Sequence, residues 1–384
     1  MIIIDIILII LLLTVIIFLT YLLLLASRAM TLKYNTATSV EPYFVVLVPV
    51  HNESAVIHRL ISSINLLDYP ADKLDVLFVA DHCDDDSAKI IRESGFEVME
   101  RNSGERGKPA ALADGIKHIL PRLSKDYDAV AIFDADNIID KDFFQHVAYR
   151  LVSGSQIVQG NTVIENHTET PFLRVNHLNM VVTNRFKELA RFQWGGCCRL
   201  RGHGMAFSKS ILNTLDWQTN SLVEDQKMLL DLILANIRIS WDHGARVSSV
   251  FPSTMEASAV QRMRWAGGKS ILIKTAVKDL YCKFIKDKDF IAFDMMVDFI
   301  MPSYAVLVGM SFLGLAGSIL INGLSLVSLG FLATTTIFLG YYFIGCYREG
   351  VPIKDFLWFF AAPFFVLWRV WIYLRSLRGP GAWH

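Results

Sequence analysis

The chain has 384 residues, 53% of them hydrophobic, with 37 basic and 37 acidic residues. That length fits one large domain or two ordinary ones, and a formal net charge of zero gives no electrostatic reason to expect nucleic acid as a partner. The five cysteines are odd in number and lack metal-ligand spacing, which argues against a disulfide framework and a zinc site.

The chain begins with an apolar run over residues 2–26, in which Asp5 is the only charge. About 20 apolar residues cross a bilayer as a helix, so the run predicts a membrane span. A cleaved signal peptide is the alternative, but the run is too long and no basic segment precedes it. Arg28 and Lys33 follow directly, and the positive-inside rule then places residue 27 onward in the cytosol.

The middle of the chain alternates between two apolar patterns. Short apolar runs at 44–50, 74–80 and 127–133 predict strands that are buried on both faces. Helical periodicity at 57–64 and 110–120 predicts helices between them. This alternation predicts an α/β fold with a mostly parallel sheet, whose ligands bind beyond the carboxyl ends of the strands.

Several polar residues follow the predicted strands. The segment Pro49-Val-His-Asn-Glu53 comes after the first strand and Asp81 after the second. The glycine-containing loop 104–108 ends at Lys108, which could meet a phosphate but is equally typical of a surface lysine.

The triplet Asp134-Ala135-Asp136 closes the third predicted strand. Side chains alternate along a strand, so Asp134 and Asp136 are expected to point the same way. Two such carboxylates can hold Mg²⁺ together with substrate phosphates, and Mn²⁺ accepts the same oxygen ligands. The alternative is a solvated, Asp-rich turn.

Two further segments carry glycines or acidic groups. The run 194–204 is unlike a regular helix, and Gly202 and Gly204 could line a groove for an acceptor or simply form a turn. In Val223-Glu224-Asp225, Asp225 suits a general base that takes a proton from an acceptor hydroxyl. A helix cap or dipole partner is the alternative for this acidic pair.

The segment Gln261-Arg262-Met263-Arg264-Trp265 places Gln261, Arg264 and Trp265 on one face of a helix. Arginine offers a bidentate fork to phosphate, and tryptophan offers a flat wall to a sugar ring. An Arg/Trp anchor at a membrane interface is the alternative.

The C-terminal part is again apolar. Residues 301–321 and 324–346 predict two spans, and the basic residues after 346 favour a cytosolic return. Residues 355–377 contain a central Arg369, which is costly inside a bilayer, so we expect an interfacial or re-entrant helix there. Four plain spans are the alternative. Residues 283–300 are expected to form another surface helix.

Together these motifs resemble family 2 glycosyltransferases with a GT-A fold. The likeness is to the membrane-integrated branch of cellulose, chitin, hyaluronan and poly-N-acetylglucosamine synthases. It covers residues 43–269 in the family's order: P-x-x-N-E, an Asp, R-G-K, D-x-D, E-D and Q-x-x-R-W, with Val223 replacing the usual Thr of T-E-D. The resemblance implies a cytosolic GT-A (Rossmann-like) domain at 28–280, between a span at 1–27 and interfacial and membrane helices at 281–384.

The resemblance also implies residue roles. Catalysis is expected from Asp225 with Glu224, and a divalent metal, Mg²⁺ or Mn²⁺, on Asp134 and Asp136. The donor, a UDP-sugar, is expected to contact Pro49, Asn52, Glu53, Asp81, Lys108, Asp134 and Arg264. The acceptor is expected to contact Gln261, Trp265, Gly202 and Gly204.

The implied function is transfer of a sugar, with inversion, from a UDP-sugar to a growing polysaccharide through a β-linkage. Transfer of one sugar to a lipid acceptor is the alternative, and a non-catalytic membrane scaffold is a third possibility. The expected location is the plasma (inner) membrane with the catalytic domain in the cytosol. The apolar ends lack mid-span charges suited to an ion pathway, which disfavours a transporter.

Overall fold

The computed structural model describes residues 2–30, 38, 40–123, 127–212, 224–361, 364–365, 367–368, 371–372 and 375. Side chains are described at these positions except 120, 122–123, 224, 260–261, 264–271 and 360–361. The chain forms two compact units. The sheet unit comprises Lys33–Glu165 and Gly196–Val250, and the helical unit comprises Met1–Leu32, Asn166–Gly195 and Phe251–His384.

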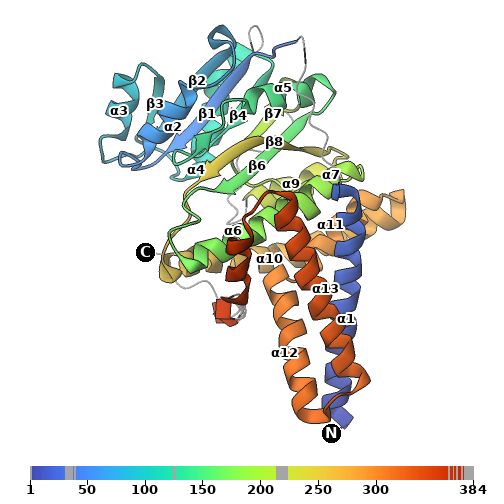
Figure 1. Cartoon of the computed structure of the whole chain (residues 1–384). Coiled ribbons are helices and arrows are strands. Elements are labelled where there is room, and N and C mark those ends of the chain that lie inside the picture. Colours follow the sequence, from blue (N-terminus) through green and yellow to red (C-terminus); the bar gives the residue numbers. More distant parts are fainter. Residues whose placement is uncertain are drawn as a thin grey trace. The chain divides into compact units, whose positions relative to one another are not determined.

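The sheet unit is built on one mixed sheet with strand order β3-β2-β1-β4-β7-β6-β8-β5 (Figure 1). Neighbours β3, β2, β1 and β4 run parallel, as do β6 and β8; β7 is antiparallel to β4 and β6, and β5 to β8. The strands are β1 Phe44–Val50, β2 Leu74–Asp81, β3 Glu97–Arg101, β4 Ala129–Ile132, β5 Ile138–Ile139, β6 Ile157–Ile164, β7 Met205–Ser208 and β8 Ile239–Ser249. The predicted mostly parallel α/β sheet is therefore confirmed.

Helices cover the sheet unit. They are α2 Ile57–Ile64, α3 Ser87–Glu93, α4 Lys108–Leu123, α5 Phe143–Val152, α8 Lys209–Leu212 and α9 Glu224–Leu234, with a 3₁₀ turn at Ala71–Lys73. Helix α4 packs very closely on β1 and β2 at Gly115, where a Cβ atom would lie 2.7 Å from Leu47 Cδ1. This close packing fixes the first residue of α4, Lys108, at the carboxyl end of the strands.

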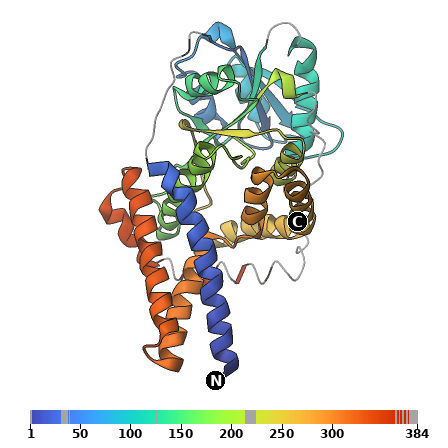
Figure 2. The ribbon, with the colours of Figure 1, turned by 90° about the vertical axis from the view of Figure 1, so that its right-hand side faces the viewer.

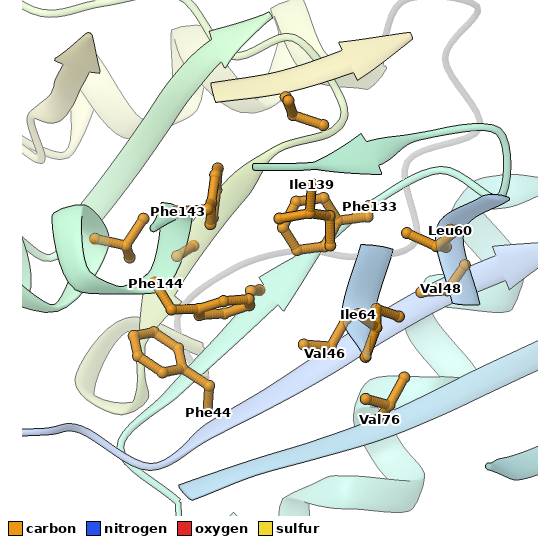
Figure 3. Close-up of a cluster of buried hydrophobic side chains, with 14 of the residues drawn as sticks. Phe44, Val46, Val48, Leu60, Ile64, Val76, Phe133, Ile139, Phe143 and Phe144 are labelled. Atoms are coloured by element: carbon orange, nitrogen blue, oxygen red, sulfur yellow. The ribbon is translucent and has the colours of Figure 1, made fainter. Parts of the chain in front are cut away.

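An aromatic cluster forms the core between the sheet and helix α5 (Figure 3). Phe44 of β1 packs edge-on against Phe144 with ring centroids 4.9 Å apart, and Phe133 packs against Phe143 at 5.1 Å. All four rings are fully buried. Replacing one such ring by alanine typically costs about 3–5 kcal/mol. The cluster therefore anchors the strand that leads into Asp134.

Among its described residues, the helical unit contains three helices that are long and apolar enough to cross a membrane: Ile2–Met30, Tyr304–Asn322 and Leu326–Arg348. They correspond to α1 (Ile2–Ala26, continued by a 3₁₀ turn), α12 and α13, which lie side by side in two views (Figures 1 and 2). These helices match the three spans expected at 2–26, 301–321 and 324–346. A polar pair, Ser311 and Thr334, joins α12 to α13 by a 2.8 Å hydrogen bond.

The remaining helices of this unit are α6 Pro171–Thr183, a π-helical turn Asn184–Leu189, α7 Ala190–Gln193, α10 Met255–Asp287, α11 Phe290–Ile300, α14 Ile353–Phe356 and a 3₁₀ turn Leu357–Ala361. The surface helix expected over 283–300 is broken at Lys288, which has φ of 55°, so its two parts belong to α10 and α11. Arg369 and much of the segment expected to form an interfacial helix at 355–377 lie outside the described residues.

A buried ionic cluster ties α11 to the π-helical turn and α7. Arg191, which is fully buried, pairs with Asp294 at 2.9 Å and Asp298 at 2.7 Å. Lys187 also pairs with Asp298. Arg191 further donates a hydrogen bond of 2.8 Å to the hydroxyl of Tyr21 in α1. We call Arg191, Lys187, Asp294 and Asp298 the Arg191 cluster.

Candidate functional site

The D-x-D carboxylates lie in a turn just beyond β4. The strand ends at Ile132, so the strand alternation expected from the sequence does not bring Asp134 and Asp136 together. A turn does so instead, closed by a 3.1 Å hydrogen bond from the Asn137 backbone N–H to the Asp134 carbonyl. Both side chains are half-buried. We call Glu53, Lys108, Asp134 and Asp136 the acidic site.

The charges of the acidic site are unevenly matched. The Lys108 ammonium pairs with Asp134. Burial raises the pKa of Asp134, but the influence of Lys108 and His203 is larger, so the pKa lies below its usual value. Burial and the charge of Asp134 raise the pKa of Asp136. Burial, followed by the charges of Asp136 and Asp134, likewise raises the pKa of Glu53. The segments that follow β1 and β4 therefore bring the three carboxylates of the acidic site and Lys108 close enough to influence one another electrostatically.

The end of β1 continues into a constrained turn. Pro49 lies near the end of β1, in register with Val79 of β2. Asn52 has φ of 55°, a left-handed conformation that asparagine tolerates, and its Oδ1 accepts a 2.8 Å hydrogen bond from the Asp84 N–H. The N–H of Glu53 donates to Ser87 Oγ at 2.8 Å. These bonds link the two strand ends and fix the backbone beside the acidic site.

Asp81, expected to contact the nucleoside, is buried and already has partners. Its Oδ1 pairs with Arg101, and its Oδ2 accepts a 2.7 Å hydrogen bond from the Gly107 N–H. Arg101 also pairs with Asp114 at 2.8 Å. Asp81 therefore holds the loop that leads into Lys108, a positioning contact that the sequence did not reveal.

The turn containing Gly202 and Gly204 is held rigidly in the sheet unit. Both glycines are left-handed, with φ of 80° and 60°, and a Cβ at Gly204 would lie 2.5 Å from Val247. The fully buried amide of Gln159 accepts from the Arg201 N–H at 2.9 Å and donates to the His203 carbonyl at 3.0 Å. A Cβ at Gly202 would lie 3.5 Å from Lys108 Nζ, so this turn borders the acidic site.

The other predicted residues are only partly described. Asp225 lies in the first turn of α9, where its Oδ1 accepts a 2.8 Å hydrogen bond from the Gln226 N–H. Glu224 begins α9, but its side chain is outside the described set, as are those of Gln261, Arg264 and Trp265 in α10. The helical conformation expected for 261–265 is present. The roles of these five residues stay predictions.

Asn137 and Gln159 are important residues that the motifs did not identify. Asn137 is fully buried, and its Nδ2 donates to Asp136 Oδ1 at 3.0 Å. Its position directly after the D-x-D triplet is the only signal for it in the sequence. Gln159 gives no such signal, because its role depends on β6 lying beside β7 in the sheet.

The carboxylates of the acidic site supply some, but not all, of the ligands that a hard divalent cation needs. Two neighbouring carboxylates, one with its pKa raised by burial and by the other's charge, are the groups that a cation would stabilise. Among the described residues, no group of three acidic, cysteine or histidine side chains is placed so that it could hold a metal ion by itself. Substrate phosphates commonly supply the remaining ligands of Mg²⁺, so the residues present fit a metal that binds together with the donor.

Comparisons with known proteins agree on one family. A family model described as "Glycosyltransferase like family 2" matches residues 42–268. The chain is 27% identical over 288 residues to a poly-beta-1,6-N-acetyl-D-glucosamine synthase of Staphylococcus epidermidis, covering 71% of this chain and 66% of the relative. It is 26% identical over 238 residues to the beta-monoglucosyldiacylglycerol synthase of Synechocystis, covering 59% and 48%.

Two further similarities complete this set. The chain is 24% identical over 242 residues to the probable glycosyltransferase YdaM of Bacillus subtilis, covering 60% of this chain and 56% of the relative. The fold is similar to that of a mannosyltransferase, PcManGT, from Pyrobaculum calidifontis, with a TM-score of 0.57, 17% identity, and coverage of 87% and 94%. The matches to these curated relatives thus span about half to two thirds of their length.

Proposed function

Because the chain belongs to the glycosyltransferase like family 2, we propose that it is a membrane-bound inverting glycosyltransferase. In this proposal it transfers a sugar from a UDP-sugar to a growing polysaccharide through a β-linkage. The observation that carries the proposal is the acidic site, which gathers Glu53, Lys108, Asp134 and Asp136 at the carboxyl ends of β1 and β4. The similarity to a poly-beta-1,6-N-acetyl-D-glucosamine synthase supports a polymer as the product.

Asp134 and Asp136 would hold a divalent cation, Mg²⁺ or Mn²⁺. Such an ion supplies positive charge that offsets the charge developing on the leaving diphosphate. The similar mannosyltransferase was solved in complex with GDP-mannose and Mn²⁺, which supports a divalent ion here. The buried Asn137 amide, bonded to Asp136 Oδ1, would keep that carboxylate oriented.

The chain's own residues would handle charge and protons. The Lys108 ammonium would contact the diphosphate, because it is the cation paired with the D-x-D motif. Asp225 would accept the proton of the acceptor hydroxyl as general base. An inverting displacement needs one base and correct alignment of the acceptor, so a covalent nucleophile is not required. Arg264 would add charge at the donor phosphate, and Gln261 and Trp265 would contact the acceptor.

The nucleoside would lie between the ends of β1 and β2. Pro49, Asn52 and Glu53 form the turn after β1, and their backbone is fixed to the β2 side. Asp81 would shape this part of the pocket through Arg101 and the Gly107 N–H.

A lipid acceptor is the second candidate. The similarity to a beta-monoglucosyldiacylglycerol synthase favours transfer of one sugar to a diacylglycerol-type lipid. The same acidic site would serve both reactions, so the acceptor distinguishes them. In either case the three apolar helices would hold the chain in the plasma (inner) membrane, with the sheet unit in the cytosol.

The test is a donor and acceptor panel with the full chain in detergent. UDP-glucose, UDP-N-acetylglucosamine, UDP-galactose and GDP-mannose are supplied with Mg²⁺ or Mn²⁺, with and without diacylglycerol, and nucleoside diphosphate release and product mass are measured. We expect one UDP-sugar to release UDP, EDTA to stop the release, and the product to be a polymer. A single-sugar lipid would establish the second candidate instead. If no donor gives transfer, either with or without diacylglycerol, the proposed function is overturned.

A further inference from the structure

Arg101 connects three parts of the sheet unit through one buried guanidinium. It is the last residue of β3, and its side chain is only 5% exposed. Its Nη1 pairs with Asp81 at the end of β2, and its Nε pairs with Asp114 of α4 at 2.8 Å. Its Nη2 donates a 3.1 Å hydrogen bond to the carbonyl of Glu105. One side chain therefore ties β2 and α4 to the loop that joins β3 to α4.

That loop is held at a second point, directly before α4. The Gly107 N–H donates a 2.7 Å hydrogen bond to Asp81 Oδ2, on the carboxylate whose Oδ1 pairs with Arg101. Gly107 has φ of 116°, in a region that favours glycine. The next residue is Lys108, the first of α4, whose ammonium pairs with Asp134 in the acidic site. The backbone that enters Lys108 is thus fixed through Asp81 and Arg101.

Arg101 suits this link by its shape and its burial. The planar guanidinium offers several N–H donors in a fixed fork, so it can bond two carboxylates and a carbonyl at once. A lysine ammonium is a compact point charge that would not span the same three acceptors. Because the side chain is buried and bonded to Asp81, Asp114 and Glu105, it can affect a ligand only through the residues that it holds.

We propose that Arg101 is a positioning residue that sets the Lys108 ammonium against the donor diphosphate. The proposal rests on the function proposed above, in which Lys108 contacts that diphosphate. Arg101 acts through Asp81 and the Glu105 carbonyl, which fix the backbone that enters Lys108. Its effect is therefore on the phosphate end of the donor, and the nucleoside end depends on it less.

The test compares UDP with uridine on the full chain in detergent with Mg²⁺, by calorimetry for UDP and by ligand-observed NMR titration for uridine. Lys108→Gln should weaken UDP binding about 10–100-fold, as expected for the loss of a hydrogen bond to a charged group. Arg101→Gln should weaken UDP binding about tenfold and leave uridine binding nearly unchanged. In the Lys108→Gln background, Arg101→Gln should have little further effect on UDP, because two residues that act through one contact are not additive.

Arg101→Lys keeps a buried positive charge beside Asp81, so it should fold even if Arg101→Gln does not. It loses the fork, and we expect it to weaken UDP binding more than uridine binding as well. The matched control is Arg92→Gln, which changes an exposed arginine of α3 that pairs with Glu100 and should leave both affinities unchanged.

Equal losses of UDP and uridine binding in the Arg101 variants would overturn the proposal, as would additive losses from Arg101→Gln and Lys108→Gln. Unchanged UDP binding by the folded Arg101 variants would overturn it too. Each of these results would leave the proposed function standing. Failure of the folded wild type to bind UDP would count against the proposed function itself, and so against both.

Discussion

The chain contains two clusters of charged side chains that differ in how well their charges are matched. In the Arg191 cluster of the helical unit, Asp294 and Asp298 are paired with cations, and Asp298 has two, Arg191 and Lys187. Arg191 and Asp298 are fully buried. Charges removed from water are tolerated when they are paired and hydrogen-bonded.

The acidic site of the sheet unit has the opposite balance. Asp136 accepts hydrogen bonds only from neutral groups among the bonds described for it, Asn137 at 3.0 Å and Ser249 at 3.4 Å. Its pKa and that of Glu53 are raised by burial and by neighbouring carboxylates. We propose from this comparison that the Arg191 cluster serves stability, whereas the acidic site keeps unmatched negative charge for a ligand. Four substitutions test this interpretation.

The largest effect is expected from Asp225→Asn. If Asp225 is the general base, its removal should lower transfer about 10⁴-fold while leaving donor binding intact, because the acidic site is unchanged. UDP release and calorimetric binding of UDP measure the two effects separately. Normal turnover by the variant would exclude Asp225 as the base. Asp231→Asn, an exposed carboxylate in the same helix that pairs with Lys227, is the matched control.

Arg191→Met should have the next largest effect, on stability. It removes the cation that pairs with Asp294 and one of the cations that pair with Asp298, and breaking a buried pair costs about 3–5 kcal/mol. Thermal unfolding in detergent measures the loss. Adding Asp294→Asn to Arg191→Met should recover part of it. An unchanged melting temperature for Arg191→Met would show that the cluster is not a stabilising element.

Asp136→Asn should separate function from stability. We expect transfer to fall about 10²–10³-fold, as when one electrostatic stabiliser is removed from an active site, together with loss of metal-dependent UDP binding. Stability should be unchanged or higher, because the substitution removes repulsion between carboxylates. Asp136 would have to be reassigned as a structural residue if the variant unfolded at a lower temperature and retained UDP binding.

Much of the fold could be predicted from the sequence because it depends on local patterns. The apolar run 44–50 coincides with β1, the periodic segment 57–64 with α2, and the three apolar spans with α1, α12 and α13. The family and the GT-A fold class are also confirmed, because the order of short motifs is a strong signal even when each motif is weak.

The contacts within the site could not be predicted in the same way. Arg101 reaches Asp81 from β3, and Gln159 reaches the 201–204 turn from β6. Each contact depends on which strands are neighbours, and that order is set by the whole sheet. The antiparallel strand β7, inserted between β4 and β6, likewise has no local signature. Motifs therefore located the charged residues, but not the groups that position them.

The smallest effect is expected from Asp242→Asn, which tests whether matched charge also stabilises the sheet unit. Asp242 is buried and pairs with Arg150 at 2.7 Å and His146 at 3.1 Å. Burial raises its pKa, but the His146 hydrogen bond and the Arg150 charge outweigh burial, so the pKa is lowered. Asparagine keeps an oxygen for the N–H groups of Gly244 and Ala245, which donate to Oδ1. The substitution therefore removes the charge and, with Oδ2, the acceptor of the Arg150 hydrogen bond, at a cost of about 2 kcal/mol.

The pH dependence of this cost has a definite sign. A carboxyl whose pKa is lower in the folded than in the unfolded chain stabilises the fold above its unfolded pKa, about 3.9. That stabilisation is lost as the pH falls through the folded pKa. Wild type and Asp242→Asn should thus differ in melting temperature at pH 7 and converge as the pH is lowered below about 4. A difference that persisted undiminished in acid would mean that the shape of the aspartate, and not its charge, stabilises this part of the sheet unit.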